Sequence, residues 1–305
     1  MYYFIVNPAS CSGKGRVIWS KIRQELTRQR IPYQCVFTKK RGDATRIASS
    51  FCSFISPCTI VAVGGDGTAN EVLNGISPNK NILFGYIPTG SSNDLARSLN
   101  LPTDPLKALF CILHPKKILL VDIGSVSDDI HERRFTVSAG IGFDAAICHE
   151  AFHSPIKPIL NQFHLGRLTY AAIAVHQLFV LKMTPMNLLL DGKQKIHFQK
   201  AYMAAIMNHP CEGGGVYFCP DAAYNDQYLD ICVLEGIPRV FAAFVLLLAF
   251  KGKHKNLPHV HIFRCKTVKI HTKYKLPVHL DGEVFGICKS ISASVTEQKL
   301  HIIIN

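Results

Sequence analysis

The chain has 305 residues, of which 48% are hydrophobic and 18% charged; this balance is ordinary for a globular protein and excludes a largely disordered one. The formal net charge of +13 favours an anionic partner such as nucleic acid, a nucleotide or an acidic membrane surface; the alternative is a basic surface without a special role. The 11 cysteines are scattered, and no signal-peptide pattern opens the sequence, so we expect free thiols in a reducing cytoplasm.

The first part of the chain alternates between strand and helix signals. Strands are predicted at four short apolar runs, 2–6, 33–38, 59–63 and 82–88, and helices at 16–30, 43–54, 69–76 and 95–99. A further helix is predicted after Asp104, which resembles an N-cap followed by Pro105 at the first helical position. This alternation is typical of a parallel sheet covered by helices, and such sheets bind ligands beyond the carboxyl ends of their strands.

The pattern changes after the apolar run 118–126, because strand-like segments then dominate. Asp191-Gly192 predicts a hairpin turn, and the apolar segment 165–181 predicts a helical insertion. We therefore expect an α/β domain followed by a mainly antiparallel β domain, with the boundary near Ile123.

An acidic residue lies inside the glycine-rich loop after the third predicted strand, Gly64-Gly65-Asp66-Gly67-Thr68. The glycines allow close approach of a ligand and positive φ, but Asp66 would repel a phosphate. Mg²⁺ that bridges the phosphates of ATP would remove this conflict, because magnesium accepts carboxylate ligands. The loop therefore favours a magnesium–nucleotide site, and the alternative is a tight turn in which Asp66 caps the next helix.

Two more loops follow predicted strands at the same edge. The segment 7–16 places serines, glycines and Lys14 before a helix, where phosphate binds, but Gly15 after the lysine excludes a Walker A loop. Taken alone, the segment would equally suit a plain turn from strand to helix. The segment 88–94 offers hydroxyl and amide groups, although Ser92 or Asn93 could equally cap the following helix.

Carboxylates accompany these loops. Asp94 ends the third loop and Asp122 is expected at the end of the strand before the domain boundary. Asp122 alone could be an ordinary strand-end residue. Together with Asp66, these acids favour metal-assisted phosphoryl transfer.

These motifs resemble the diacylglycerol kinase catalytic family of lipid kinases. The similarity covers 63–76 and 87–99, the Gly-rich segment 213–234, and Leu280–Glu283, in the order found in that family. The glycine loop alone also occurs in NAD kinases, whereas the ordered set is specific. The resemblance implies a soluble, bacterial-type enzyme with two domains, 1–123 and 124–294, with the active site in the cleft between them and residues 295–305 returning to the first domain.

The resemblance also implies roles for individual residues. Glu283 would accept the proton of the lipid hydroxyl, with Asp281 beside it, because a carboxylate within hydrogen-bond reach can activate a weak alcohol nucleophile. Without the other motifs, Leu280–Glu283 would equally suit a solvated hairpin turn. The residues implied to contact ATP are Asn7, Pro8, Ala9, Ser10, Cys11, Thr38, Gly64, Gly65, Asp66, Gly67, Thr68, Ala69, Asn70 and Ser91.

A structural Mg²⁺ is implied at the side chain of Asp226 and the carbonyl groups of Ala223 and Tyr228. The family usually has glycine after this aspartate, and here the residue is Gln227. If the position requires positive φ, glutamine is a strained choice.

The expected reaction is ATP-dependent phosphorylation of diacylglycerol to phosphatidic acid in lipid metabolism, in the cytoplasm at an anionic membrane. No run reaches the ~18 apolar residues of a membrane-spanning helix. Val240–Phe250 alone favours a core helix, but in a lipid kinase it could form, with 165–181 and Lys251–Lys255, a membrane-docking face. A homodimer is compatible with these expectations.

Several alternatives stay open. The acceptor could be another lipid alcohol, such as a sphingoid base or a polyprenol. An NAD kinase is disfavoured by the apolar segments, and a nucleotide sensor without activity is disfavoured by the complete set of acids. A nucleic-acid-binding surface over the basic stretch 251–275 matches no recognition motif, so we expect no nucleic-acid partner.

Overall fold

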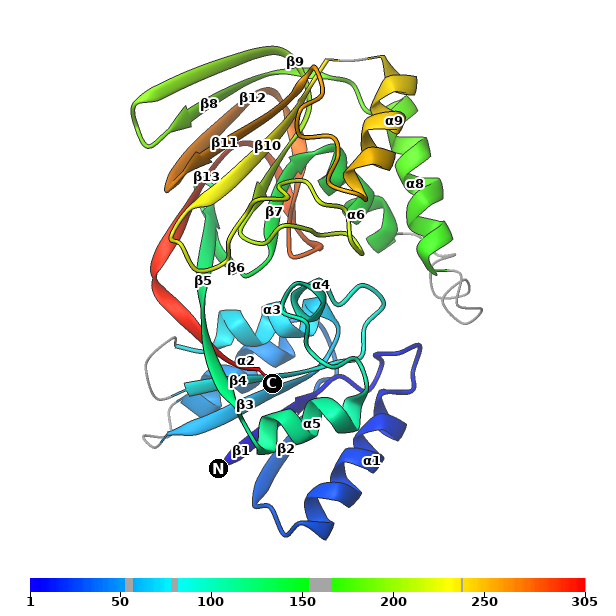
Figure 1. Ribbon diagram of the computed structural model, residues 1–305, viewed down its shortest axis with the longest axis vertical. Helices are drawn as coiled ribbons and strands as arrows, with labels where there is room; N and C mark the ends of the chain where they lie inside the picture. The colour runs from blue at the N-terminus through cyan, green and yellow to red at the C-terminus, as the bar shows by residue number, and fades with distance from the viewer. Residues whose placement is uncertain (53–56, 78–81, 154–165, 237, 305) are drawn as a thin grey trace. The chain divides into compact units, whose positions relative to one another are not determined.

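The computed structural model describes residues 1–52, 57–77, 82–153, 166–236 and 238–304 (Figure 1). The chain divides into two compact units. Residues 1–123 and 297–305 form the first unit, and residues 124–296 form the second. The division after Ile123 falls where the sequence changes from alternating to strand-rich.

The first unit is built around a sheet with parallel pairings. Strand β1 pairs in parallel with β2 and β3, β3 pairs with β4, and the end of β13 joins β4 through Ile302 and Phe84. The elements of this unit are β1 (Tyr2–Val6), α1 (Gly15–Arg28), β2 (Tyr33–Phe37), α2 (Asp43–Cys52), β3 (Cys58–Gly64), α3 (Asp66–Gly75), β4 (Ile82–Pro88), α4 (Asp94–Ser98), α5 (Pro105–Leu113), the start of β5 (Lys117–Ser127) and the end of β13 (Glu283–Ile304). Because parallel strands end at the same edge, the loops after β1 to β4 gather there.

Helices cover both faces of this sheet. Trp19 of α1 and Leu109 of α5 pack with Phe4 of β1 in one buried apolar cluster. On the other face, Tyr3 of β1 packs against Phe51 of α2 with ring centroids 4.6 Å apart. The predicted helix start at α5 is confirmed, since the Asp104 carboxylate accepts the backbone N–H groups of residues 106 and 107. The expected end of α2, at residue 54, lies outside the described residues.

The second unit consists mainly of antiparallel strands. Strand β9 pairs with β8, β10 and β7, β12 pairs with β8, β7 and β13, and β10 pairs with β11. The elements are the rest of β5, β6 (Glu132–Phe135), β7 (Ser138–Gly142), α6 (Phe143–His153), α8 (Gly166–Val180), β8 (Thr184–Leu190), β9 (Gln194–Met207), β10 (Leu229–Glu235), α9 (Arg239–Ala249), β11 (Val260–Cys265), β12 (Thr267–Leu280) and most of β13.

Two apolar clusters hold this unit together, and strand alternation divides the side chains between them. In β9, Ala204 and Ile206 enter a cluster with β7, β8 and β12, whereas Met203 and Ala205 face a cluster with the helices. The helices α6, α8 and α9 therefore cover one face of the strands (Figure 1). The start expected for α8, residue 165, lies outside the described residues. The predicted hairpin turn is confirmed, with Asp191 and Gly192 at φ of 48° and 67° between β8 and β9.

Among the described residues, no helix is long and apolar enough to cross a membrane. Helix α9 is not the core helix that its sequence alone favours. It buries Ala242, Val245 and Ala249, while Val240 and Leu247 are 81% and 67% exposed.

Candidate active site

Direct hydrogen bonds join three loops at the carboxyl edge of the first unit. Asn7 Nδ2 donates to Thr68 Oγ1 over 3.2 Å, which ties the loop after β1 to helix α3. The Thr89 hydroxyl donates to Ser10 Oγ over 2.8 Å, and the Thr89 N–H donates to the Gly64 carbonyl over 2.7 Å. The structure therefore brings together the ends of β1, β3 and β4, which the sequence marked as a nucleotide site.

The glycines of the second loop are required for close packing. A Cβ on Gly64 would lie 2.3 Å from Thr68 Oγ1, and a Cβ on Gly90 would lie 2.6 Å from the Gly65 Cα. The described backbone has no positive φ at Gly64, Gly65 or Gly67, so the positive φ considered for this loop is not needed there. Because Gly65 and Gly90 have no side chains, the loop after β3 can contact the loop after β4.

Helix α3 begins at Asp66, directly after this contact. Gly65 occupies the N-cap position, so Asp66 lies in the first turn and does not cap the helix from outside. The first N–H groups of a helix have no intrahelical partners and form an anion site. Backbone donors and the Asp66 carboxylate therefore occur at one point.

The loop after β1 carries an unusual backbone. Its start is fixed because Asn7 Oδ1 accepts the Ala9 N–H over 3.0 Å and the Asn7 carbonyl accepts the Ser10 hydroxyl over 2.8 Å. Cys11 and Ser12 then follow with φ of 52° and 54°, a left-handed conformation that is uncommon for residues other than glycine. Such strain often occurs at ligand-binding loops.

The other residues predicted to contact ATP lie in different surroundings. Thr38 directly follows β2, where its N–H donates to the Val6 carbonyl over 2.9 Å. Ala69 and Asn70 are buried in α3, whereas Ser91 is exposed after β4. The neighbouring Asn93 does not cap α4 with its side chain, which instead bonds to both backbone groups of Gly90.

Asp122 does not lie at a strand end, so that expectation is wrong. It lies within β5 and is fully buried, with its carboxylate 2.9 Å from Lys299 Nζ of β13. The strand continues to Ser127, and Gly124 within it leaves room for the Phe135 ring, which a Cβ on Gly124 would meet at 2.1 Å. Asp122 is therefore placed as one half of a buried ion pair.

The three acids of the first unit do not form one metal-binding group. Asp94 is buried at the start of α4, with Oδ1 3.9 Å from Arg97 Nε. Among the described residues, Asp66, Asp94 and Asp122 do not belong to a set of ligand atoms that all lie within 4.8 Å of one another. Of these three acids, Asp66 directly follows Gly65, which packs on Gly90 of the next loop.

In the second unit, Asp281 anchors the turn between β12 and β13. Its carboxylate accepts the N–H groups of Thr136, Val137 and Ser138 over 3.0, 2.8 and 3.1 Å, and the Thr136 hydroxyl over 3.2 Å. Asp281 and Gly282 have φ of 48° and 78°, as in a tight two-residue hairpin turn. Asp281 is thus occupied as an acceptor and is a poor candidate for a general base.

Glu283 comes directly after this turn and begins β13 opposite Leu280. Its side chain is partly exposed. Of the two acids in the motif, Glu283 is the more exposed, because Asp281 is buried by the backbone that it binds.

A buried charged cluster, which the sequence analysis did not identify, lies beside the turn. His279 Nε2 is 3.2 Å from Asp144 Oδ2 and 3.8 Å from Glu212 Oε2, and all three side chains are buried. Burial would lower the pKa of His279, but the Glu212 and Asp144 carboxylates outweigh it and raise this pKa to about 9. His279 lies near the end of β12, two residues before Asp281 of the turn, and this closeness in sequence is the signal that could have identified the cluster.

The residues implied for a structural Mg²⁺ do not fit a divalent ion. Asp226 Oδ1 accepts the Tyr228 N–H over 3.0 Å, and Oδ2 accepts from the Arg264 guanidinium, so both carboxylate oxygens have partners. Arg264 also lies over the Tyr228 ring, 4.6 Å from its centroid. A cation therefore already stands where the carboxylate would bind magnesium. Ala223 lies three residues before Asp226 in the same loop.

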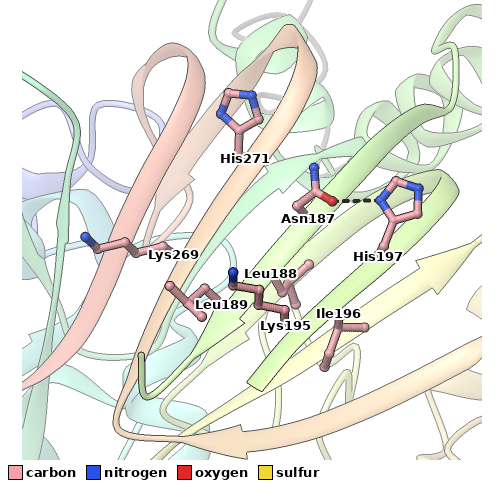
Figure 2. Close-up of a pocket in the computed structure, with 8 residues that line it drawn as sticks. All are labelled: Asn187, Leu188, Leu189, Lys195, Ile196, His197, Lys269 and His271. Atoms are coloured by element: carbon pink, nitrogen blue, oxygen red, sulfur yellow. Dashed lines mark hydrogen bonds between the residues drawn. The ribbon is translucent and has the colours of Figure 1, made fainter. Parts of the chain in front are cut away.

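The structure also has a groove of about 320 Å³ on the second unit that the predicted site does not use (Figure 2). It lies on β8, β9 and β12, where Asn187 Oδ1 and His197 Nδ1 are 2.7 Å apart. The lining residues are Asn187, Leu188, Leu189, Lys195, Ile196, His197, Lys269 and His271, and the sequence analysis assigned a role to none of them.

Comparison with known proteins agrees with this arrangement. Residues 1–126 match the diacylglycerol kinase catalytic domain, and residues 137–304 match the YegS C-terminal NAD kinase beta sandwich-like domain. A diacylglycerol kinase of Bacillus subtilis (strain 168) is 30% identical over 290 residues, which cover 93% of this chain and 89% of that protein.

Solved structures share the fold. The crystal structure of a diacylglycerol kinase from Bacillus anthracis str. Sterne has a TM-score of 0.72 at 22% identity and covers 100% of this chain and 96% of that one. An NAD kinase from Archaeoglobus fulgidus in complex with ATP has a TM-score of 0.54 at 13% identity, with coverage of 100% and 94%. By its matched domains and its relatives, the chain belongs to the diacylglycerol kinase catalytic family of lipid kinases.

Proposed function

We propose that the chain transfers the terminal phosphoryl group of ATP to the hydroxyl group of diacylglycerol and so forms phosphatidic acid. The observation that carries this proposal is the junction of loops around the start of α3, where bonds from Asn7 and Thr89 hold the glycine loop. The 30% identical diacylglycerol kinase supports the choice of acceptor. A sphingoid base or a polyprenol is the alternative acceptor, because the loops read the nucleotide and not the lipid.

Asp66 is the residue that would hold the Mg²⁺ bound to ATP. A carboxylate suits magnesium, and its place in the first turn of α3 puts it next to the N–H groups expected to take the phosphates. When bound, the ion neutralises charge that develops on the transferred group. The chain itself supplies the backbone donors and fixes their position through Thr68 and Thr89.

Glu283 is proposed as the base that takes the proton of the acceptor hydroxyl. Its carboxylate is partly exposed, while Asp281 next to it holds the turn on the backbone of residues 136–138. The two acids of one motif thus have separate tasks. A positioned base contributes about 10²–10⁴-fold to rate.

An anionic bilayer is proposed to contact helices α8 and α9. Phe179 of α8 and Phe244 and Leu247 of α9 are 58%, 49% and 67% exposed, and Arg239 of α9 lies 5.9 Å from the Phe179 ring centroid, so the exposed faces adjoin. Side chains of this size on neighbouring helices form an apolar face that suits a membrane interface.

Lysines next to α9 would add an electrostatic contribution. Lys251 and Lys253 are exposed, whereas Lys255 Nζ lies 2.7 Å from the Asp221 carboxylate. We therefore expect Lys251 and Lys253 to contribute about 2 kcal/mol to the free energy of membrane binding at low salt, without a contribution from Lys255. Binding to anionic vesicles should weaken as ionic strength rises, and Lys251→Gln/Lys253→Gln should weaken it further.

The test of the proposed function is incubation with radiolabelled ATP and separate panels of diacylglycerol, a sphingoid base, a polyprenol and NAD. We expect label in phosphatidic acid, near-complete loss of labelling for Asp66→Ala, and a fall in kcat with little change in ATP affinity for Glu283→Gln. Label in NAD alone, or normal turnover by Asp66→Ala, would overturn the proposal.

A further inference from the structure

The turn at Asp226 keeps its conformation although it lacks the expected glycine. Gln227 has φ of 62°, in the left-handed region that glycine occupies most readily. The strain that the sequence suggested is therefore present. A strained turn persists where its surroundings hold it in place.

The Asp226 carboxylate and its partners hold this turn. One oxygen accepts the Tyr228 N–H over 3.0 Å and thus spans Gln227, while the other binds the Arg264 guanidinium. Arg264 belongs to β11, where it pairs opposite Asp230 of β10, so a regular ladder fixes its backbone.

The guanidinium has a second contact that restricts it further. It lies 4.6 Å from the centroid of the Tyr228 ring, and Lys266 Nζ lies 5.5 Å from the same ring. Two side-chain cations therefore flank the residue whose carbonyl the family pattern offers to magnesium. A divalent ion at Asp226 would be repelled by the guanidinium and would have to displace Arg264 from the carboxylate.

We propose that the Arg264 guanidinium replaces the structural Mg²⁺ of the family at the Asp226 turn. The fold of this chain then depends on no divalent ion at that position, and magnesium enters only with the nucleotide. A guanidinium suits this task because it stays charged and offers several donors in a fixed plane. The proposal does not depend on which alcohol the enzyme phosphorylates.

The experiment uses the full chain without nucleotide or lipid, so it cannot be confused with a failure of the proposed activity. Thermal unfolding is followed in EDTA and in millimolar Mg²⁺ for the wild type, Arg264→Gln and Lys255→Gln. Lys255→Gln is the matched control, because it removes a cation from the pair with Asp221 and leaves the Asp226 turn intact. We expect the same midpoint in both buffers for the wild type and the control. Arg264→Gln should unfold several degrees lower in EDTA and recover part of that loss in Mg²⁺.

A binding measurement keeps the proposal testable if Arg264→Gln does not fold. Mn²⁺, whose free form is detected by electron paramagnetic resonance, is titrated into nucleotide-free wild type and Asp226→Asn. We expect no binding to the wild type at submillimolar Mn²⁺. One tightly bound ion that Asp226→Asn abolishes, or a wild-type midpoint that falls in EDTA, would overturn the proposal.

Discussion

Asp281→Asn is expected to destabilise the second unit, because the Asp281 carboxylate organises a row of backbone donors. It accepts the N–H groups of Thr136, Val137 and Ser138 and the Thr136 hydroxyl in a buried position. An asparagine amide must turn its NH₂ toward one of these donors. The orientation that costs least turns the NH₂ toward Thr136. The buried Thr136 N–H then has no acceptor, which costs about 1–3 kcal/mol of unfolding free energy. The two remaining bonds lose their charged acceptor, at about 1 kcal/mol each.

The total is therefore about 3–5 kcal/mol, and it should lower the unfolding midpoint by about 6–20 °C for a unit of this size. The assay is thermal unfolding followed by circular dichroism, with Glu283→Gln measured beside it. Glu283 is two residues away and partly exposed, so its variant should keep the wild-type midpoint and lose turnover. An Asp281→Asn protein with an unchanged midpoint and no turnover would refute this reasoning and make Asp281 part of the chemistry.

Three further outcomes follow from other residues. The pKa of His279 is about 9 in the folded protein and 6.5 ordinarily, so the stability it contributes is complete below pH 6.5 and lost as pH rises through 9. Unfolding by urea across this range should show that fall in the wild type, and His279→Gln should remove it. Lys299→Met leaves the Asp122 charge buried without its partner and should cost about 3–5 kcal/mol of unfolding free energy, most of it recovered in Lys299→Met/Asp122→Leu; equal stability of both variants would contradict this. Phe244→Asn/Leu247→Asn should keep the wild-type midpoint and reduce co-sedimentation with anionic vesicles more than tenfold, since burying such a side chain contributes about 1.5–3 kcal/mol; unchanged co-sedimentation would exclude this face from docking.

The sequence predicts the first unit well, because its signals are local. Apolar runs, glycine loops and the cap at Asp104 each lie within a few residues, and the parallel arrangement follows from their alternation. Asp122 shows where such reasoning fails. Its place within β5 and its pairing with Lys299 depend on a strand made about 180 residues later, which no local pattern reveals.

The candidate site was predictable to a similar degree. The motifs identified the loops of the first unit and the turn of the second. Within the first unit, however, the loops are held by Thr89, and within the second the turn is held by Thr136, and no motif includes Thr136. The replacement of magnesium by Arg264 was equally hidden. The departure at Gln227 signalled a strained turn, while the compensating cation stands on another strand.

The first unit is assembled from two separate stretches, because residues 297–305 complete the sheet formed by residues 1–123. All of the second unit is synthesised between them. On the ribosome, the nucleotide-binding sheet must therefore wait with its β4 edge unpaired until the intervening 173 residues have emerged. An unpaired strand edge can pair with other chains. We therefore expect this kinase to depend most on chaperones during the time in which its first unit is made but lacks residues 297–305.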